Sequence, residues 1–309
     1  MKRGIFLSLL STLLFVGVLS CSENPAKNDV SPRLRVVTTL FVLYDFARAV
    51  GGDQAEVSLL IPPGVEPHGY EPKPGDIARM KGADLCIYTG SAMEPWFDRV
   101  LTVLDTRKTS VVEAGGGVHS ASDIRDHGGG GGHYDPHVWL DLSSAQRMVD
   151  TIRDGFAHRD PAHGEQYAAN AEALKSRLAA LDERFRRGLS TCSSRVIIYG
   201  GHTAFSYLAK RYGLQFEAAY KGFSPDAEPT PRHLAELTEK MKRYGLKYVF
   251  YEELVAPRVA QTLARETGAE LLMLHGAHNV SRQDMEKGVT FIVLMERNLA
   301  NLRVGLQCR

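Results

Sequence analysis

Apolar and polar positions along the chain follow two alternating periods. In the first half, short apolar runs typical of buried strands alternate with segments of helical spacing. The strands are expected at residues 34–40, 56–62, 84–90 and 109–115, and the helices at 44–52, 73–83 and 95–104. The second half repeats the alternation, with strands at 194–201, 247–253 and 269–276 and helices at 229–245 and 257–268. This pattern predicts an α/β fold with mainly parallel sheets flanked by helices.

A single apolar stripe marks the segment between the two halves, residues 164–189. Its members recur at steps of four and three: Tyr167, Ala171, Leu174, Leu178, Leu181 and Phe185. The spacing predicts one helix of about 26 residues and about 39 Å. A coiled coil would need more heptads than this segment holds. A chain of 309 residues suits two domains, which a helix of this length could bridge.

The N-terminus has the layout of an export signal. Lys2 and Arg3 precede a mostly apolar run that ends in Ser20, and the run is short for a membrane span. The sequence VLSC resembles the lipobox of bacterial lipoproteins, which would make Cys21 a lipidated N-terminal residue. An ordinary signal peptide cut nearby is the alternative. Residues 1–20 are therefore interpreted as a signal peptide and residues 21–33 as a flexible tether.

Charge and cysteine content fit an exported protein. Without Lys2 and Arg3 the chain has 35 basic and 36 acidic residues, and this balance argues against nucleic acid as a partner. Cys86 lies in an apolar run and is expected to be a buried thiol. An oxidising compartment would permit a disulfide between Cys192 and Cys308, although spacing alone does not establish that they are close.

Four histidines occupy positions where a metal site could form. His68 lies in a loop with five prolines between Pro62 and Pro74, and such a loop would hold the imidazole in one orientation. His68, His202 and His275 follow expected strands, and His137 belongs to a second Pro-His pair. Ligands of open α/β sheets bind at the carboxyl ends of strands, and imidazole is a preferred ligand of Zn²⁺. Each histidine could instead be an ordinary surface or core residue.

The stretch 114–135 is rich in glycine and contains His119, His127 and His133. It has no apolar face to pack, so residues 115–133 are expected to form a mobile loop. Two hypotheses stay open for it. Either its histidines bind zinc weakly and pass it inward, or the loop is an insertion without function.

Three segments resemble the metal-ligand segments of ABC-transporter solute-binding proteins that capture zinc or manganese. They are PPGVEPHGYEPKPGDI, DPHVWLDL and GGHTAFSYLAKRYGL, and further motifs extend the resemblance from about residue 34 to residue 308. The resemblance implies that His68, His137 and His202 are ligands. The family commonly supplies an aspartate as the fourth ligand, for which this chain offers His275, with His278 or a water in reserve. Nitrogen donors favour Zn²⁺ over Mn²⁺, so one zinc site of the zinc-uptake subtype is expected.

The same resemblance implies two α/β lobes joined by a single long backbone helix, with the metal between the lobes. The expected boundaries are 34–160 for the N-terminal lobe, 161–190 for the linking helix and 191–309 for the C-terminal lobe. The protein is expected to be a monomer that is lipid-anchored in the periplasm or on the outer face of the cell membrane. Its expected partner is an ABC permease. Glu66, Glu71 and Asp141 could orient the ligands or be solvated loop charges.

Other functions remain as alternatives. A manganese-binding member of the same family is one alternative, although the resemblance implies that manganese-type members place a glutamate where this chain has His202. A secreted zinc hydrolase would need an open coordination position and a carboxylate base beside the metal-bound water, and no paired motif supplies that base, so an enzyme is not expected. A surface adhesin would leave no residue signature of its own.

Overall fold

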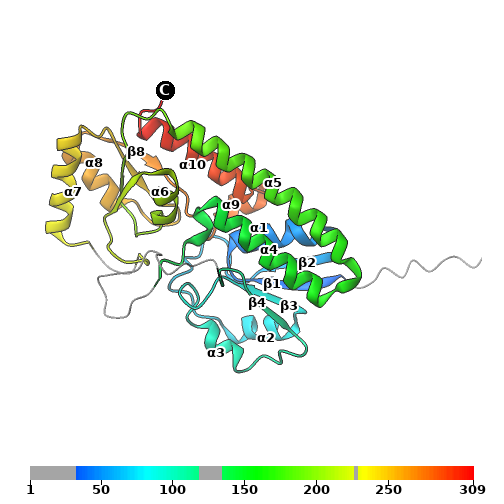
Figure 1. The fold of residues 1–309 in the computed structure, drawn as a ribbon. Helices are drawn as coiled ribbons and strands as arrows, with labels where there is room; N and C mark the ends of the chain where they lie inside the picture. Colours follow the sequence, from blue (N-terminus) through cyan, green and yellow to red (C-terminus); the bar gives the residue numbers. More distant parts are fainter. Residues whose placement is uncertain (1–32, 118–133, 226–228) are drawn as a thin grey trace, which may run out of the picture. The chain divides into compact units, whose positions relative to one another are not determined.

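Two parallel sheets form the centres of two lobes in the computed structural model, which describes residues 33–117, 134–225 and 229–309 (Figure 1). In the N-terminal lobe the strands are β1 Leu34–Thr38, β2 Ala55–Leu59, β3 Leu85–Tyr88 and β4 Ser110–Glu113, in the order β2-β1-β3-β4. In the C-terminal lobe they are β5 Val196–Tyr199, β6 Gln215–Ala218, β7 Tyr248–Tyr251 and β8 Glu270–Met273, in the order β6-β5-β7-β8. Every neighbouring pair is parallel, as the alternating pattern predicts.

Helices cover both faces of each sheet. The N-terminal lobe contains α1 Phe41–Gly51, η1 Gly52–Gln54, α2 Pro74–Gly82, α3 Phe97–Leu101, η2 Val138–Leu140, α4 Leu142–Arg159 and η3 Pro161–His163. The C-terminal lobe contains α6 Ser206–Tyr212, α7 Pro231–Tyr244, α8 Arg258–Thr267, α9 Arg282–Glu286 and α10 Phe291–Gly305. The expected helix at 95–104 is shorter, because turns surround α3 on both sides.

Side chains of the strands alternate between the two faces. Val36 and Leu85 belong to the core formed with α1 and α4, whereas Val37 and Cys86 belong to the separate core under α2 and α3. Because successive strand residues point to opposite faces, a strand buried on both sides must be apolar throughout. Cys86 is a buried free thiol, as expected.

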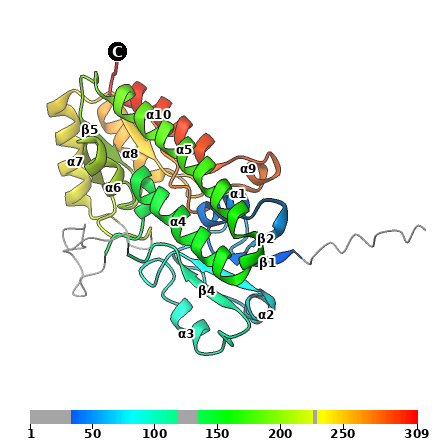
Figure 2. The same cartoon turned by 45° about the vertical axis from the view of Figure 1, so that its right-hand side comes forward.

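The long helix α5, Gly164–Leu189, has 26 residues and belongs to both lobes. Its buried face includes the predicted stripe from Tyr167 to Phe185. The helix packs against α1 and α4 at one end and against α6 and α10 at the other, and Figures 1 and 2 show α5 and α10 side by side. A single apolar core therefore runs through both lobes.

Two more contacts link distant parts of the chain. The backbone N–H of Phe291, at the start of α10, donates to Asp45 Oδ2 of α1 at 2.9 Å. A disulfide joins Cys192 to Cys308, so that predicted pairing is confirmed. It ties the end of α10 to the segment that follows α5.

In the part of the chain that the structure describes, no helix has the length and apolar character needed to cross a membrane.

Candidate metal centre

Three imidazoles from three distant segments converge between the lobes. The Nε2 atom of His137 lies 3.2 Å from Nε2 of His68 and 3.2 Å from Nε2 of His202. Tetrahedral nitrogens bound to zinc at about 2.0–2.1 Å lie about 3.3 Å apart. The observed separations therefore fit three ligands of one zinc ion.

Each histidine is positioned by its own segment. His68 lies in the proline loop, which turns through hydrogen bonds from Val65 N to Pro62 O and from Tyr70 N to Pro67 O. His137 directly precedes η2. His202 follows β5 at the point where the order of strands reverses between β5 and β7, which is where ligands of such sheets bind.

Glycines make the close approach at His202 possible. A Cβ on Gly200 would lie 2.5 Å from Cβ of Ala260, and a Cβ on Gly201 would lie 2.7 Å from Oε2 of Glu252. Real Cβ atoms do not approach other atoms this closely, so larger residues at these positions would displace the neighbouring groups. The Gly-Gly pair thus lets His202 and Glu252 lie side by side.

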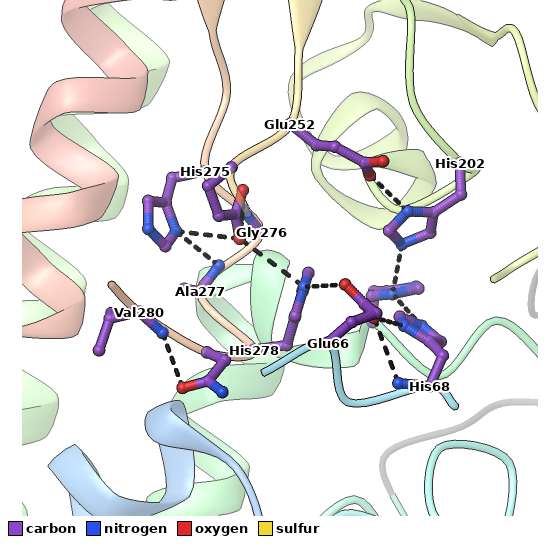
Figure 3. A network of polar contacts seen from close by, with 12 residues as sticks. Glu66, His68, His202, Glu252, His275, Gly276, Ala277, His278 and Val280 are labelled. Atoms are coloured by element: carbon purple, nitrogen blue, oxygen red, sulfur yellow. Dashed lines mark hydrogen bonds and ion pairs between the residues drawn. The ribbon is translucent and has the colours of Figure 1, made fainter. Parts of the chain in front are cut away.

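A carboxylate lies behind each of the three rings. His68 Nδ1 donates to Glu66 Oε1 at 2.6 Å, and His137 Nδ1 donates to Asp135 Oδ1 at 2.8 Å. His202 Nδ1 donates to Glu252 Oε2 at 2.6 Å (Figure 3).

An imidazole that donates through Nδ1 keeps the lone pair of Nε2 for a metal ion, and the carboxylate fixes the ring's direction. The three rings are therefore oriented as ligands of one ion.

Two of the three acidic residues singled out in the sequence have other roles. Glu66 does orient a histidine. Glu71, however, forms an exposed ion pair with Arg99, and Asp141 caps α4 and pairs with Arg211.

The sequence interpretation missed Asp135 and Glu252. The repeated pattern acidic residue–Pro–His, at residues 66–68 and 135–137, was a readable signal for Asp135. Glu252 lies 50 residues from His202, and no local pattern links the two.

The charge state of the centre depends on burial. Burial raises the pKa of Asp135 to about 8 and the pKa of Glu252 to about 7, because an ionised carboxylate loses its hydration. Burial also raises the pKa of Glu66, but the hydrogen bond from His68 and the charges of His278 and His68 outweigh it and lower that pKa to about 2. Burial, followed by the charges of neighbouring histidines, lowers the pKa of His137 well below its usual value. The ring of His137 is therefore neutral, as a ligand must be.

The fourth position differs from the expectation. The structure does not bring His275 to the other three histidines; Figure 3 shows its ring on the opposite side of Gly276 from His68 and His202. The Nδ1 atom of His275 accepts from the backbone N–H of Ala277 at 3.0 Å and lies 3.3 Å from Glu253 Oε1. His275 is thus engaged within the C-terminal lobe and is not brought to the three rings, where the sequence placed it as the fourth ligand.

His278, the reserve candidate, lies against the group instead. The centre of its ring is 5.6 Å from that of His68, 6.0 Å from that of His202 and 6.2 Å from that of His137. Its Nε2 lies between two carboxylates, 3.7 Å from Glu253 Oε1 and 3.9 Å from Glu66 Oε2.

Burial lowers the pKa of His278 to about 4, which keeps this ring neutral as well. Cys21, His119, His127 and His133 lie outside the described residues.

Comparisons with known proteins agree with this geometry. A family model described as "Zinc-uptake complex component A periplasmic", ZnuA, matches residues 36–305. The chain is 36% identical over 303 residues to the zinc-binding lipoprotein AdcA of Streptococcus pneumoniae; the match covers 96% of this chain and 60% of that protein. The chain thus spans less than two thirds of that relative's length.

A second relative is matched over nearly its whole length. The chain is 33% identical to the high-affinity zinc uptake system protein ZnuA of Bacillus subtilis, over 98% of this chain and 97% of that protein. The fold also resembles the crystal structure of the Zn(II)-bound ZnuA-like domain of Streptococcus pneumoniae AdcA, with a TM-score of 0.75, 36% identity, and coverage of 89% of this chain and 99% of that one. The chain belongs to the ZnuA family of periplasmic zinc-uptake components.

Proposed function

We propose that the protein binds one Zn²⁺ ion with high affinity outside the cytoplasm and delivers it to an ABC permease. The observation that supports this most directly is the convergence of three Nε2 atoms, each on a ring whose Nδ1 is held by a carboxylate. Ordering these rings in advance removes a cost that would otherwise be subtracted from affinity. The names of the relatives, which refer to zinc binding and zinc uptake, point to the same function.

The proposed ligands are His68, His137, His202 and His278. Four nitrogen donors favour Zn²⁺ over Mn²⁺, which prefers carboxylate and water ligands. Manganese binding by the same site is the alternative within the family. Competition titrations of metal-free protein with both ions test the assignment, and tighter binding of Mn²⁺ than of Zn²⁺ would overturn it.

A hydrolytic reaction receives no support from the site. The carboxylates nearest the three rings, Glu66, Asp135 and Glu252, are hydrogen-bonded to Nδ1 atoms and act there as orienting groups. A hydrolase would need a carboxylate free to take a proton from a metal-bound water. Zinc-loaded protein that hydrolysed ester or peptide substrates would contradict the proposal of a binding protein.

Membrane attachment is proposed to occur through Cys21, by lipidation at the sequence VLSC. Replacement Cys21→Ser should move the mature protein from the membrane fraction to the soluble fraction without changing its zinc affinity. Intact mass measurement of the wild-type protein provides the second readout, because a lipid adds a defined mass to the N-terminus.

Two hypotheses remain for the role of the glycine–histidine loop, residues 115–133. His119, His127 and His133 either bind zinc weakly and pass it inward or have no such role. Deletion of residues 115–132 tests this. Unchanged affinity, stoichiometry and transfer rate would support an insertion without function.

A further inference from the structure

The segment from Gly276 to Val280 forms a bridge between the lobes beside the candidate metal centre. It belongs to the C-terminal lobe, but its hydrogen bonds reach the N-terminal lobe. The bonds run from Trp139 Nε1 to Gly276 O at 2.7 Å, from Phe41 N to His278 O at 2.9 Å and from Gly64 N to Val280 O at 2.8 Å. Ala277 has a positive φ of 59°, a conformation that a non-glycine residue adopts at a cost.

Asn279 lies in this bridge, and its side chain donates hydrogen bonds to the backbone of the proline loop. Its Nδ2 donates to Pro62 O at 2.8 Å and to Val65 O at 2.7 Å, and its Oδ1 accepts from Val280 N at 2.8 Å. The residue is 1% exposed. Both amide hydrogens and the carbonyl oxygen of this buried side chain are therefore used.

One of the two carbonyls that Asn279 binds, Val65 O, belongs to the residue directly before Glu66, which orients His68. Val65 is followed by Glu66, whose carboxylate accepts from both Nδ1 and the backbone N–H of His68. A displacement of the loop at Val65 would therefore move Glu66 and change the direction in which Nε2 of His68 points. The other two rings, His137 and His202, are held by separate segments.

We propose that Asn279 is a positioning residue that locks the loop Pro62–Glu66 and thereby sets how long zinc stays bound. This inference rests on the proposed zinc-binding function. Loss of the two donors leaves two carbonyl groups without their partner and gives the loop freedom that it must lose again at each binding event. The effect falls on His68, so the ion should leave more quickly while the lobes remain folded.

If the amide of Asn279 had only a structural role, its loss would lower stability without a specific effect on zinc dissociation. A matched variant at another asparagine distinguishes the two roles. Asn301 also donates its Nδ2 to one backbone carbonyl, Met273 O at 2.8 Å, and it is partly buried. This contact lies wholly within the C-terminal lobe. Asn301→Ala should therefore lower stability without altering the loop.

The experiment compares wild-type protein with Asn279→Ala, Asn279→Asp, Asn279→Ser and Asn301→Ala. Dissociation of Zn²⁺ into excess chelator gives the residence time, and hydrogen exchange of the metal-free proteins reports the amide of Gly64. We expect about tenfold faster dissociation for Asn279→Ala and Asn279→Asp, which lack the donors, and a smaller change for Asn279→Ser, which keeps one hydroxyl donor. Exchange at Gly64 should accelerate in the same order, and Asn301→Ala should match the wild type in both.

The outcomes separate the inference from the function on which it rests. Wild-type protein that fails to bind Zn²⁺ would overturn the proposed function and the residence-time role together. Wild-type binding combined with an unchanged dissociation rate in Asn279→Ala would overturn the role of Asn279 alone. Should Asn279→Ala fail to fold, Asn279→Ser gives the same decision, because a wild-type rate in that variant, with faster exchange at Gly64, also contradicts the proposal.

Discussion

The Nε2 atoms of His68 and His137 lie 3.2 Å apart, although the two residues are separated by 69 positions in the chain. Each of the two histidines follows a proline, and an acidic residue precedes that proline. The same local unit, carboxylate–proline–imidazole, is thus used twice to aim a lone pair at one point. His202 reaches that point from the other lobe with the help of Glu252.

The first prediction concerns this orienting carboxylate. Glu252→Gln keeps the size of the side chain but removes the charge that holds His202 Nδ1 at 2.6 Å. Replacement of such a partner lowers metal affinity by about 10–100-fold, and we expect a loss in this range, measured by competition with a chromophoric chelator. The control is Glu71→Gln, since Glu71 is exposed and paired with Arg99. Equal losses in the two variants would show that net charge, and not orientation, governs affinity.

The second prediction distinguishes the two candidates for the fourth ligand. His278→Ala should weaken zinc binding by more than about tenfold, because a direct donor should matter at least as much as an outer partner. His275→Ala should change affinity much less, since its ring is engaged with the backbone of Ala277. Titration of both variants under the same conditions gives the answer. A larger loss for His275→Ala would restore the assignment made from the sequence.

The third prediction concerns the disulfide between Cys192 and Cys308, which closes a loop of 116 residues. A crosslink across a loop of this length stabilises a protein by about 5 kcal/mol in the chain-entropy view. The double variant Cys192→Ser, Cys308→Ser should therefore unfold at lower denaturant concentration, as wild-type protein should after reduction. Zinc affinity should stay the same, because neither residue contacts the histidines in the described structure. A parallel loss of affinity would contradict this separation.

The fourth prediction concerns pH and the buried carboxyl of Glu94, which lies outside the metal centre. Burial raises its pKa to about 7, although hydrogen bonds from Thr39, Thr89 and Gly90 oppose the shift. Because the folded-state pKa lies above the unfolded value, the stabilisation from this group is complete below about pH 4.5 and is lost as the pH rises through about 7.

Glu94→Gln removes this titration. Denaturant unfolding of metal-free wild type and variant at pH 5 and pH 8 should show that the variant gains relative stability at the higher pH. The shift from 4.5 to about 7 corresponds to a change of about 3 kcal/mol. Protonation of the histidines affects both proteins equally and cancels in the comparison. Parallel pH profiles would show that Glu94 does not titrate in this range.

Much of the fold was predictable because it depends on local periodicity. The apolar stripe from Tyr167 to Phe185 predicted α5, and the alternation of strands and helices predicted parallel sheets. The order of strands was not predictable, because pairing depends on contacts between residues far apart in the chain. The helix expected at 95–104 was too long, since apolar residues at both ends pack as turns instead.

The candidate site was predictable to the extent that its residues follow strands or prolines. His68, His137 and His202 do so, and the structure brings them together. The choice between His275 and His278 depended on a backbone turn at Ala277, where φ is 59°. No sequence rule places a positive φ on an alanine, so counting from the end of β8 did not reveal which histidine lies beside the other three rings. Glu252 was not predictable either, because it lies 50 residues from His202 in the chain.

The continuous apolar core around α5 and α10 has a mechanical consequence. Separation of the two lobes would expose side chains such as Phe46 and Phe291, whose rings lie 5.1 Å apart. It would therefore remove much of the hydrophobic stabilisation of the fold. Release of the metal ion must then involve a small local change at the metal centre instead of a large movement of one lobe away from the other. In such a protein, single substitutions near the metal centre can change metal affinity while the fold stays intact.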